Sequence, residues 1–178
     1  MPVPAPLAER LKEAVRSVRD FPRRGILFWD VTTVLSDPGA FRDSVEALTE
    51  PFKGDHVEIV VGVESRGFVL GGAVALMLHA GFVPVRKAGR LPSDTISAAY
   101  ALEYGEAVLE MHSDAIAPRQ RVLIVDDLLA TGGTAAATVQ LVEQLGGVVV
   151  GLAFLIELPD LGGGSAIGAH RRVSLVNL

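Results

Sequence analysis

Four short, almost continuously apolar runs place the strongest limit on how this chain can fold. Each is bounded by glycine or charged residues, and they lie at residues 57–63, 82–85, 121–125 and 148–155. Helical patterns at residues 67–79 and 133–145 separate two pairs of these runs. Strands that are hydrophobic throughout are typical of parallel sheets that helices cover on both faces. The sequence therefore predicts an α/β domain with a central, mostly parallel sheet flanked by helices.

The first third of the chain predicts two further helices. Apolar residues recur at helical spacing among charged residues over 7–18, which predicts an amphipathic helix. Residues 22–36 show no clear periodicity and predict an irregular segment. Asp37 and Pro38 are a typical N-cap and first position of a helix, and its apolar stripe extends over 41–52.

Residues 86–112 interrupt the alternation of strands and helices. Residues 86–94 predict a loop, and residues 99–104 and 107–112 flank Gly105 like the two strands of a hairpin. A long insertion in a compact α/β domain is often a lid over an active site. We therefore expect a small lid hairpin beside the sheet.

Composition narrows the class of protein further. The chain has 178 residues, 49% of them hydrophobic, which fits one folded domain. A net charge of -5 argues against a surface that coats nucleic acid, and the absence of Cys excludes disulfides, thiolate metal sites and a cysteine nucleophile. No apolar stretch reaches the roughly 20 residues of a membrane span, and residues 1–6 carry no signal-peptide pattern. We expect a single cytoplasmic domain without a membrane or nucleic-acid partner. Within this domain, the three glycines at residues 162–164 predict a turn.

One stretch concentrates the residues that can do chemistry. The apolar run at 121–125 leads into two carboxylates, Asp126 and Asp127, and then into a loop of small and hydroxyl-bearing residues before a helix. In open α/β sheets, ligands bind at the carboxyl ends of strands, and a helix N-terminus binds anions through its free N–H groups. Sugar hydroxyls beside the carboxylates and a phosphate beside the amides describe a ribose 5-phosphate.

An ordinary connection with helix-capping residues is the alternative for this stretch. Capping needs one such residue, whereas two adjacent acids lose solvation and repel each other unless a ligand or metal uses them. The loop is not a Walker A motif, because no Gly-Lys-Ser/Thr follows it. We therefore favour the binding site.

With these residues the sequence resembles the type I phosphoribosyltransferases. The apolar run, the paired acids and the segment from Ala130 to Thr134 match the phosphoribosyl pyrophosphate motif of that family. Further segments are similar to its adenine phosphoribosyltransferase branch: residues 21–30, 64–68, 86–92, 100–106, 128–134 and 155–158. The resemblance covers about residues 7–160. It implies one domain over 1–178, with a base-binding hood at about 7–36 and a lid loop and hairpin at about 86–112.

The resemblance implies a reaction and a ribose site. Phosphoribosyl pyrophosphate would transfer its 5-phosphoribosyl group to N9 of adenine, giving AMP and pyrophosphate. Asp126 and Asp127 would bind the ribose hydroxyls and favour the positive charge that develops on the ribose. Five residues, which we call the phosphate loop, would hold the 5′-phosphate: Ala130, Thr131, Gly132, Gly133 and Thr134.

For the leaving pyrophosphate, the resemblance implies Arg66 and Lys87, with backbone donors from the turn at Glu64 and Ser65. In this family the turn carries a strained non-proline peptide, and a cis bond between Glu64 and Ser65 is one form of it. The family more often has Asp where Glu64 stands. On local sequence alone, Lys87 also fits a solvated strand end. Mg²⁺ is the expected cofactor, held mainly by substrate and water rather than by protein ligands.

For adenine, the resemblance implies a site made of Leu27, Phe28, Trp29 and Leu129. Phe28 would stack on the purine, backbone groups of Leu27 and Trp29 would bind its edge, and Leu129 would add an apolar wall. The family usually has Arg where Trp29 stands. Core packing is an equally good interpretation of Phe28 from local sequence.

Glu103 in the lid hairpin is the candidate acid or base of the reaction. A carboxylate that closes over the purine could exchange a proton with its ring nitrogens as N9 attacks. A salt bridge within the hairpin is the alternative role.

Three other functions stay open at this point. The first is a phosphoribosyltransferase for another purine, such as xanthine or hypoxanthine. The second is a regulator of the same fold that senses phosphoribosyl pyrophosphate, and the third is an α/β protein without chemistry. The resemblance also implies a homodimer.

Overall fold

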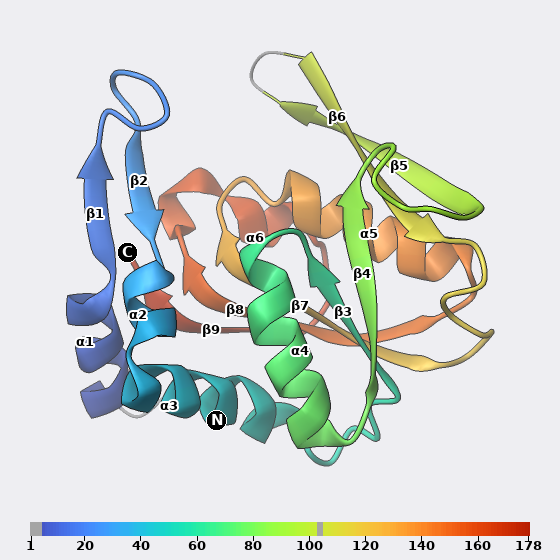
Figure 1. The fold of residues 1–178 in the computed structure, drawn as a ribbon, viewed down its shortest axis with the longest axis horizontal. Helices are drawn as coiled ribbons and strands as arrows, with labels where there is room; N and C mark the ends of the chain where they lie inside the picture. Colours follow the sequence, from blue (N-terminus) through green and yellow to red (C-terminus); the bar gives the residue numbers. More distant parts are fainter. Residues whose placement is uncertain (1–4, 103–104) are drawn as a thin grey trace.

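A seven-stranded sheet forms within residues 5–102 and 105–178, which are the residues that the computed structural model describes (Figure 1). Its strands are β3 (Ile59–Val63), β4 (Gly81–Lys87), β5 (Thr95–Leu102), β6 (Gly105–His112), β7 (Arg121–Leu129), β8 (Val148–Glu157) and β9 (Arg172–Asn177). Their order across the sheet is β5-β6-β4-β3-β7-β8-β9. The pairs β4–β3, β3–β7, β7–β8 and β8–β9 are parallel, whereas β6 pairs antiparallel with both β4 and β5. The predicted, mostly parallel sheet is confirmed, and so is a hairpin beside it. Its first strand begins at Thr95 rather than at residue 99 and Gly105 is already part of β6, and its role as a lid stays a prediction.

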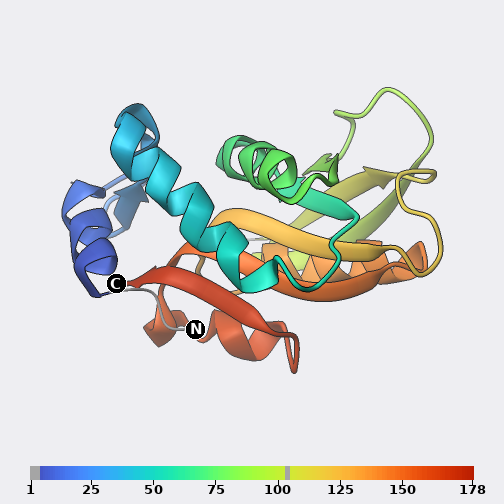
Figure 2. The same cartoon turned by 90° about the horizontal axis from the view of Figure 1, so that it is seen from below.

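Helices cover both faces of this sheet. The described helices are α1 (Ala5–Ala14), α2 (Thr32–Ser36), α3 (Pro38–Thr49), α4 (Arg66–Leu78), α5 (Gly133–Gln144) and α6 (Gly163–Ala166), with 3-10 turns at Glu50–Phe52 and Pro159–Leu161. Figure 2 shows α3 and α4 on one side of the sheet and α5 on the other. The predicted cap at the start of α3 is confirmed, since the carboxylate of Asp37 accepts a hydrogen bond of 2.6 Å from the N–H of Ala40. No described helix is long and apolar enough to cross a membrane.

The central strands divide their side chains between two apolar cores. Val60, Leu123 and Val125 belong to the core under α3 and α4, whereas Val61 and Ile124 belong to the core under α5. Successive side chains of a strand point to opposite faces, so a strand that is covered on both sides must be apolar at every position. This is the physical reason for the continuous apolar runs in the sequence.

The N-terminal region departs from the prediction. Helix α1 ends at Ala14, and Arg16–Arg19 forms strand β1, which pairs antiparallel with β2 (Leu27–Asp30). The predicted helix over 7–18 is therefore too long, and the segment 22–36 is not irregular, because it holds β2 and α2. Val18 lies opposite Phe28 in this ribbon, and such cross-strand pairing is invisible to a search for helical spacing.

The order of the strands places a ligand site between β3 and β7. From β3 the chain passes through α4 to β4 on one side, and later returns to β7 on the other side, from which α5 leads to β8. Ligands of open α/β sheets bind where the direction of strand order changes in this way, at the carboxyl ends of the strands. Figure 1 shows the β1–β2 ribbon and the β5–β6 hairpin extending at the two flanks of this edge.

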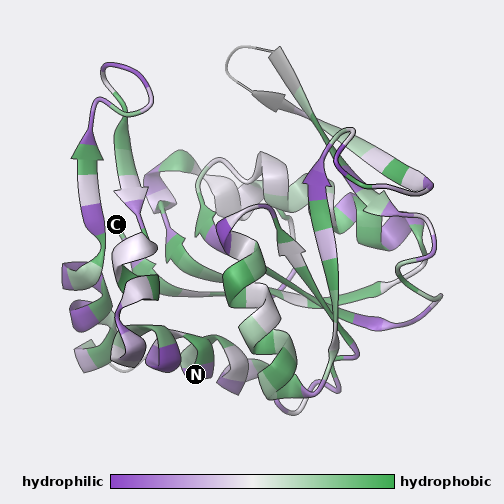
Figure 3. Cartoon of the chain, viewed as in Figure 1, coloured by the Kyte–Doolittle hydropathy of each residue, from purple (hydrophilic) through white to green (hydrophobic). Residues whose placement is uncertain are grey.

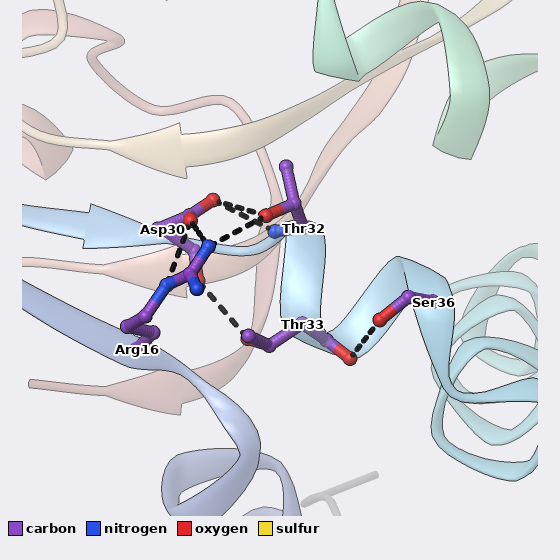
Figure 4. Close-up of polar contacts among 5 residues, drawn as sticks. All are labelled: Arg16, Asp30, Thr32, Thr33 and Ser36. Atoms are coloured by element: carbon purple, nitrogen blue, oxygen red, sulfur yellow. Dashed lines mark hydrogen bonds and ion pairs between the residues drawn. The ribbon is translucent and has the colours of Figure 1, made fainter.

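A charged cluster fixes the start of the β1–β2 ribbon to α2 (Figure 4). Arg16 Nε donates to Asp30 Oδ2 at 3.1 Å, and the Thr32 hydroxyl and backbone N–H donate to Asp30 Oδ1 at 2.7 and 3.0 Å. The hydrogen bond from Arg16, followed by those from Thr32, lowers the pKa of Asp30 from 3.8 to about 2. Because the pKa is depressed in the folded protein, ionised Asp30 stabilises the fold above pH 3.8 and loses this effect as the pH falls toward 2.

Arg16→Ala is expected to lower the free energy of unfolding at pH 7 by about 1 kcal/mol or less, because the Arg16 side chain is more than half exposed. The difference from wild type should shrink as the pH falls from about 4 toward 2, where Asp30 of the wild type is about half protonated. Urea unfolding at the two pH values measures it. Arg19→Ala, on the same strand, is the control, and an equal loss in both variants at pH 7 would contradict the role of Arg16.

Candidate active site

A pocket of about 310 Å³ opens at the carboxyl ends of β3 and β7, where the strand order predicts a site. Its walls come from the end of β3, the start of α4, the end of β4, the hairpin and the β7–α5 connection. Most of the predicted site residues line it: Glu64, Arg66, Lys87, Asp126, Asp127, Leu129, Ala130, Thr131, Gly132, Gly133 and Thr134. The tertiary structure thus gathers the predicted ribose, phosphate and pyrophosphate groups around one cavity.

The two adjacent carboxylates lie within strand β7 rather than after it. The predicted strand end at residue 125 is too early, because pairing with β8 continues through Asp126 to Leu129. Asp126 is 8% exposed and Asp127 is 6% exposed. Burial raises the pKa of Asp126 well above its usual range, and the charge of Asp127 raises it further. The N–H of Asp127 donates to Asp126 Oδ1 at 2.8 Å, which offsets part of this cost.

Arg66 connects Asp127 to the aromatic side chain of the hood. It is the first residue of α4, and its Nε forms an ion pair with Asp127 Oδ2. The centre of the same guanidinium lies 5.4 Å from the centroid of the Phe28 ring. This distance is typical of a cation–π contact. One cation therefore contacts a predicted ribose ligand and the predicted adenine-stacking ring at the same time.

The phosphate loop ends at the N-terminus of α5. Gly132 is the N-cap and has a φ of +82°, a left-handed conformation that glycine adopts without steric cost. The first N–H groups of a helix have no partner within the helix and carry a partial positive charge. The loop therefore presents donors to the pocket of the kind that hold a phosphate.

The turn at Glu64 and Ser65 links β3 to α4. The peptide bond between these residues is cis, which is the form named in the sequence analysis. Glu64 lines the pocket and forms an ion pair with Arg86, whose Nε lies 3.3 Å from Glu64 Oε2. Ser65 does not belong to the pocket lining, whereas Lys87 at the end of β4 does. The structure thus places Lys87 at the pocket, although its predicted contact with pyrophosphate stays a prediction.

The predicted adenine residues divide into two groups. Leu129 is buried in the wall of the pocket. Leu27, Phe28 and Trp29 lie on β2, outside the pocket lining, and Trp29 packs against the core under α3 and α4. The centroid of the Phe28 ring lies 5.1 Å from that of Phe21 in an edge-to-face arrangement. The same ring contacts the guanidinium of Arg66, which lines the pocket. Phe28 belongs to neither apolar core, so the core-packing interpretation is wrong, whereas its stacking on a purine stays a prediction.

Tyr100 is a pocket residue to which the sequence analysis gave no role. It lies on β5, and its Cδ2 atom is 2.8 Å from where a Cβ at Gly133 would be. The ring therefore packs on the first residue of α5 and couples the hairpin to the phosphate loop. Only the pairing of the hairpin with the sheet could reveal this contact. Glu103, the predicted acid or base, lies outside the described residues.

The side chains of the pocket offer few ligands for a metal ion. Among the residues that the structure describes, no group of three or more His, Asp or Glu side chains could hold a metal ion. Asp126 and Asp127 offer the hard oxygen donors that Mg²⁺ prefers. Two carboxylates fit an ion that takes its remaining ligands from a substrate and water.

Comparisons with known proteins agree with this site. The Phosphoribosyl transferase domain family matches residues 35–165. The adenine phosphoribosyltransferase of Methylobacterium nodulans is 57% identical over 159 residues, which cover 89% of this chain and 88% of that protein. The crystal structure of adenine phosphoribosyltransferase from Rhodothermus marinus has a TM-score of 0.95 and 53% identity, covering 98% of this chain and 100% of that chain. The Saccharomyces cerevisiae enzyme, solved with an imino-altritol bisphosphate and adenine, has a TM-score of 0.91 and 41% identity, covering 97% and 99%.

The fold and the site together define a phosphoribosyltransferase, and the chain belongs to that family. Within the family, the identity and coverage of its relatives place it among the adenine phosphoribosyltransferases.

Asp126→Asn is expected to stabilise the free protein at neutral pH while weakening its ligand site. Because the pKa of Asp126 is raised on folding, its charge costs stability above its ordinary pKa of 3.8, and the neutral amide removes that cost. Each 1 kcal/mol gained raises Tm by about 2–4 °C in a chain of this size. Affinity for ribose 5-phosphate should fall about tenfold or more, since a charged acceptor is lost.

Thermal unfolding from pH 4 to pH 8 and calorimetry with ribose 5-phosphate measure these two effects. The gain in Tm over wild type should grow as the pH rises from 4. Asp127→Asn is the contrasting variant, because it leaves the Arg66 guanidinium without its carboxylate and should bring no gain. An unchanged or lower Tm of Asp126→Asn at pH 8 would contradict this account of the buried acid.

Proposed function

We infer that this chain serves purine salvage by transferring the 5-phosphoribosyl group of phosphoribosyl pyrophosphate to N9 of adenine, with AMP and pyrophosphate as products. The observation that carries this conclusion is the pair of buried carboxylates beside the phosphate loop in one pocket. Relatives named adenine phosphoribosyltransferase support adenine as the base. The rest of the mechanism follows from what each wall of the pocket offers to that substrate.

The ribose would lie between the acids and the start of α5. Asp126 and Asp127 would accept hydrogen bonds from its 2′- and 3′-hydroxyls, and the phosphate loop would hold the 5′-phosphate. Breaking the bond to pyrophosphate builds positive charge on the ribose, and two carboxylates fixed in a buried site stabilise that charge without first reorganising. The protein needs no nucleophile, because positioning and electrostatics suffice for this displacement.

The leaving pyrophosphate would meet the cations at the other wall. Arg66 and Lys87 line the pocket from α4 and β4, and both can pair with phosphate oxygens. We propose that Mg²⁺ arrives with the substrate, where it would neutralise charge on the leaving group. Asp126, Asp127 and the substrate's oxygens would hold it. Because Arg66 also pairs with Asp127 in the free protein, binding of pyrophosphate would compete for this guanidinium.

Adenine would enter from the side of the hood. Phe28 is the available stacking surface there, and its ring face is covered by Arg66 in the free protein. Leu129 and its neighbour Leu128 make the apolar wall of the pocket. A 6-oxopurine would need a donor at that wall, and no Lys occurs between Arg121 and Leu145. This wall therefore favours adenine over hypoxanthine, guanine and xanthine. Proton exchange with Glu103 and a cytoplasmic location stay predictions.

A panel of bases tests the substrate. With phosphoribosyl pyrophosphate and Mg²⁺, the protein should form the nucleotide from adenine and little or none from hypoxanthine, guanine or xanthine. Asp126→Asn combined with Asp127→Asn should lower kcat/KM by about a hundredfold or more, because charge stabilisation in the transition state is lost. Chromatographic detection of the nucleotide measures both. Product from xanthine or hypoxanthine alone would show that the substrate is that base and not adenine. Binding of phosphoribosyl pyrophosphate without turnover of any base would favour the sensing role.

We propose further that the chain forms a homodimer through the outer face of α4. Val69, Leu76 and Met77 lie on one side of this helix and are exposed, Leu76 to 80%. Figure 3 shows hydrophobic colour along much of the side of α4 that faces the viewer. An exposed apolar helix face of this kind marks an interaction surface, and the family's homodimers make a second copy the expected occupant.

Leu76→Lys is expected to convert the dimer to a monomer, since a charge at the centre of an apolar interface loses solvation without a partner. Light scattering coupled to size-exclusion chromatography measures the mass. Lys53→Glu, a charge change at an exposed residue outside α4, is the control and should leave the dimer intact. A monomeric wild type, or a dimeric Leu76→Lys, would contradict this interface.

A further inference from the structure

A glycine-rich turn after β8, which we define as residues 162–164, lies directly against the phosphate loop. It contains the start of α6 and does not belong to the pocket lining. A Cβ at Gly163 would lie 2.2 Å from the carbonyl oxygen of Ala130 and 3.1 Å from the backbone nitrogen of Gly132. Real side chains do not come that close to backbone atoms, so the loop occupies the space that any side chain at Gly163 would need.

The contact is reciprocal. A Cβ at Gly132 would lie 2.5 Å from the carbonyl oxygen of Gly163 and 2.7 Å from the Cβ of Ala166. Gly132 also has a φ of +82°, so its own backbone conformation favours glycine, whereas at Gly163 the constraint is space alone. Two backbone segments that are distant in the sequence therefore fit together with no side chain between them. A shift of one segment requires a shift of the other.

The turn is itself held to the sheet from behind. The guanidinium of Arg172 lies against Gly164, where a Cβ would be 2.5 Å from its Nη2, and Arg172 Nε donates to Glu157 Oε1 at 3.1 Å. Ile167, just after α6, is buried in the core under α5. On the other side of the contact, the N–H of Leu158 donates to the carbonyl of Leu129 at 2.9 Å, directly before the phosphate loop. The turn is thus packed between the phosphate loop and Arg172 of β9.

We propose that Gly163 is a positioning residue for the 5′-phosphate subsite. Its missing side chain lets the turn support the backbone of the phosphate loop, so that the N–H groups at the start of α5 are aimed into the pocket. This inference rests on the proposed function, because the loop's role as the phosphate site is part of it. The proposed adenine side of the pocket uses none of these N–H groups. A side chain at Gly163 should therefore weaken the binding of ligands that carry a phosphate and leave the binding of adenine unchanged.

Gly163→Ala tests this directly, with Gly164→Ala as the matched control. The control makes the same chemical change in the same helix, but its new methyl group meets the end of the flexible Arg172 side chain instead of the loop. Calorimetry with ribose 5-phosphate and steady-state kinetics supply the readouts. Since a displacement of about 1 Å in a binding group is costly, Gly163→Ala should weaken ribose 5-phosphate binding and raise the KM for phosphoribosyl pyrophosphate about tenfold or more. The KM for adenine at saturating phosphoribosyl pyrophosphate should stay within about twofold of wild type.

Equal affinity of Gly163→Ala and wild type for ribose 5-phosphate would overturn the proposal, and so would an equal rise of both KM values. If Gly163→Ala does not fold, hydrogen exchange of the wild-type protein decides. Binding of ribose 5-phosphate should slow amide exchange in residues 159–168, and unchanged exchange there would overturn the proposal. A wild-type protein that does not bind ribose 5-phosphate at all would contradict the proposed function instead.

Discussion

The structure depends on keeping two adjacent carboxylates buried near the carboxyl end of the central strand β7. Asp126 and Asp127 are almost inaccessible, and Arg66 is the cation that pairs with them, through Asp127. Desolvation and mutual repulsion make this arrangement unfavourable in the free protein, which the raised pKa of Asp126 records. In the proposed function, a substrate that brings ribose hydroxyls and develops positive charge would offset both penalties. Stability is thus given up where the chemistry needs negative charge.

Arg66 and Gly163 show how the surrounding fold serves this site. Arg66 contacts Asp127 and the Phe28 ring at once, so the proposed pyrophosphate, ribose and adenine regions would share one guanidinium. Gly163 lies behind the phosphate loop and fixes its backbone without touching the pocket. In both cases a residue outside β7 and α5 contacts a group that these two elements carry, a carboxylate or the phosphate loop. The site is therefore a property of the strand order, which brings α4, the hairpin and the C-terminal turn to one edge.

Much of the fold was predictable because its strands are apolar on both faces, and helical spacing between them identified α4 and α5 within one residue at each end. The N-terminal region was not predictable in this way. Val18 fits a helical spacing equally well, and only its pairing opposite Phe28 makes it part of a strand. Strand β9 was missed as well, because residues 172–177 mix polar and apolar positions at the edge of the sheet. Most predicted site residues gather at the pocket, whereas Leu27, Phe28 and Trp29 lie beside it on β2.

The sequence by itself determined the class of fold, the paired acids and the phosphate loop, because each depends on residues that are neighbours along the chain. Apolar runs, an N-cap and a glycine with positive φ are local requirements, and local composition reveals them. The tertiary structure alone decided that Arg66 pairs with Asp127, that Tyr100 packs on Gly133 and that Gly163 supports Ala130. These contacts join segments up to 61 positions apart, and they exist only because the sheet orders its strands in space rather than in sequence.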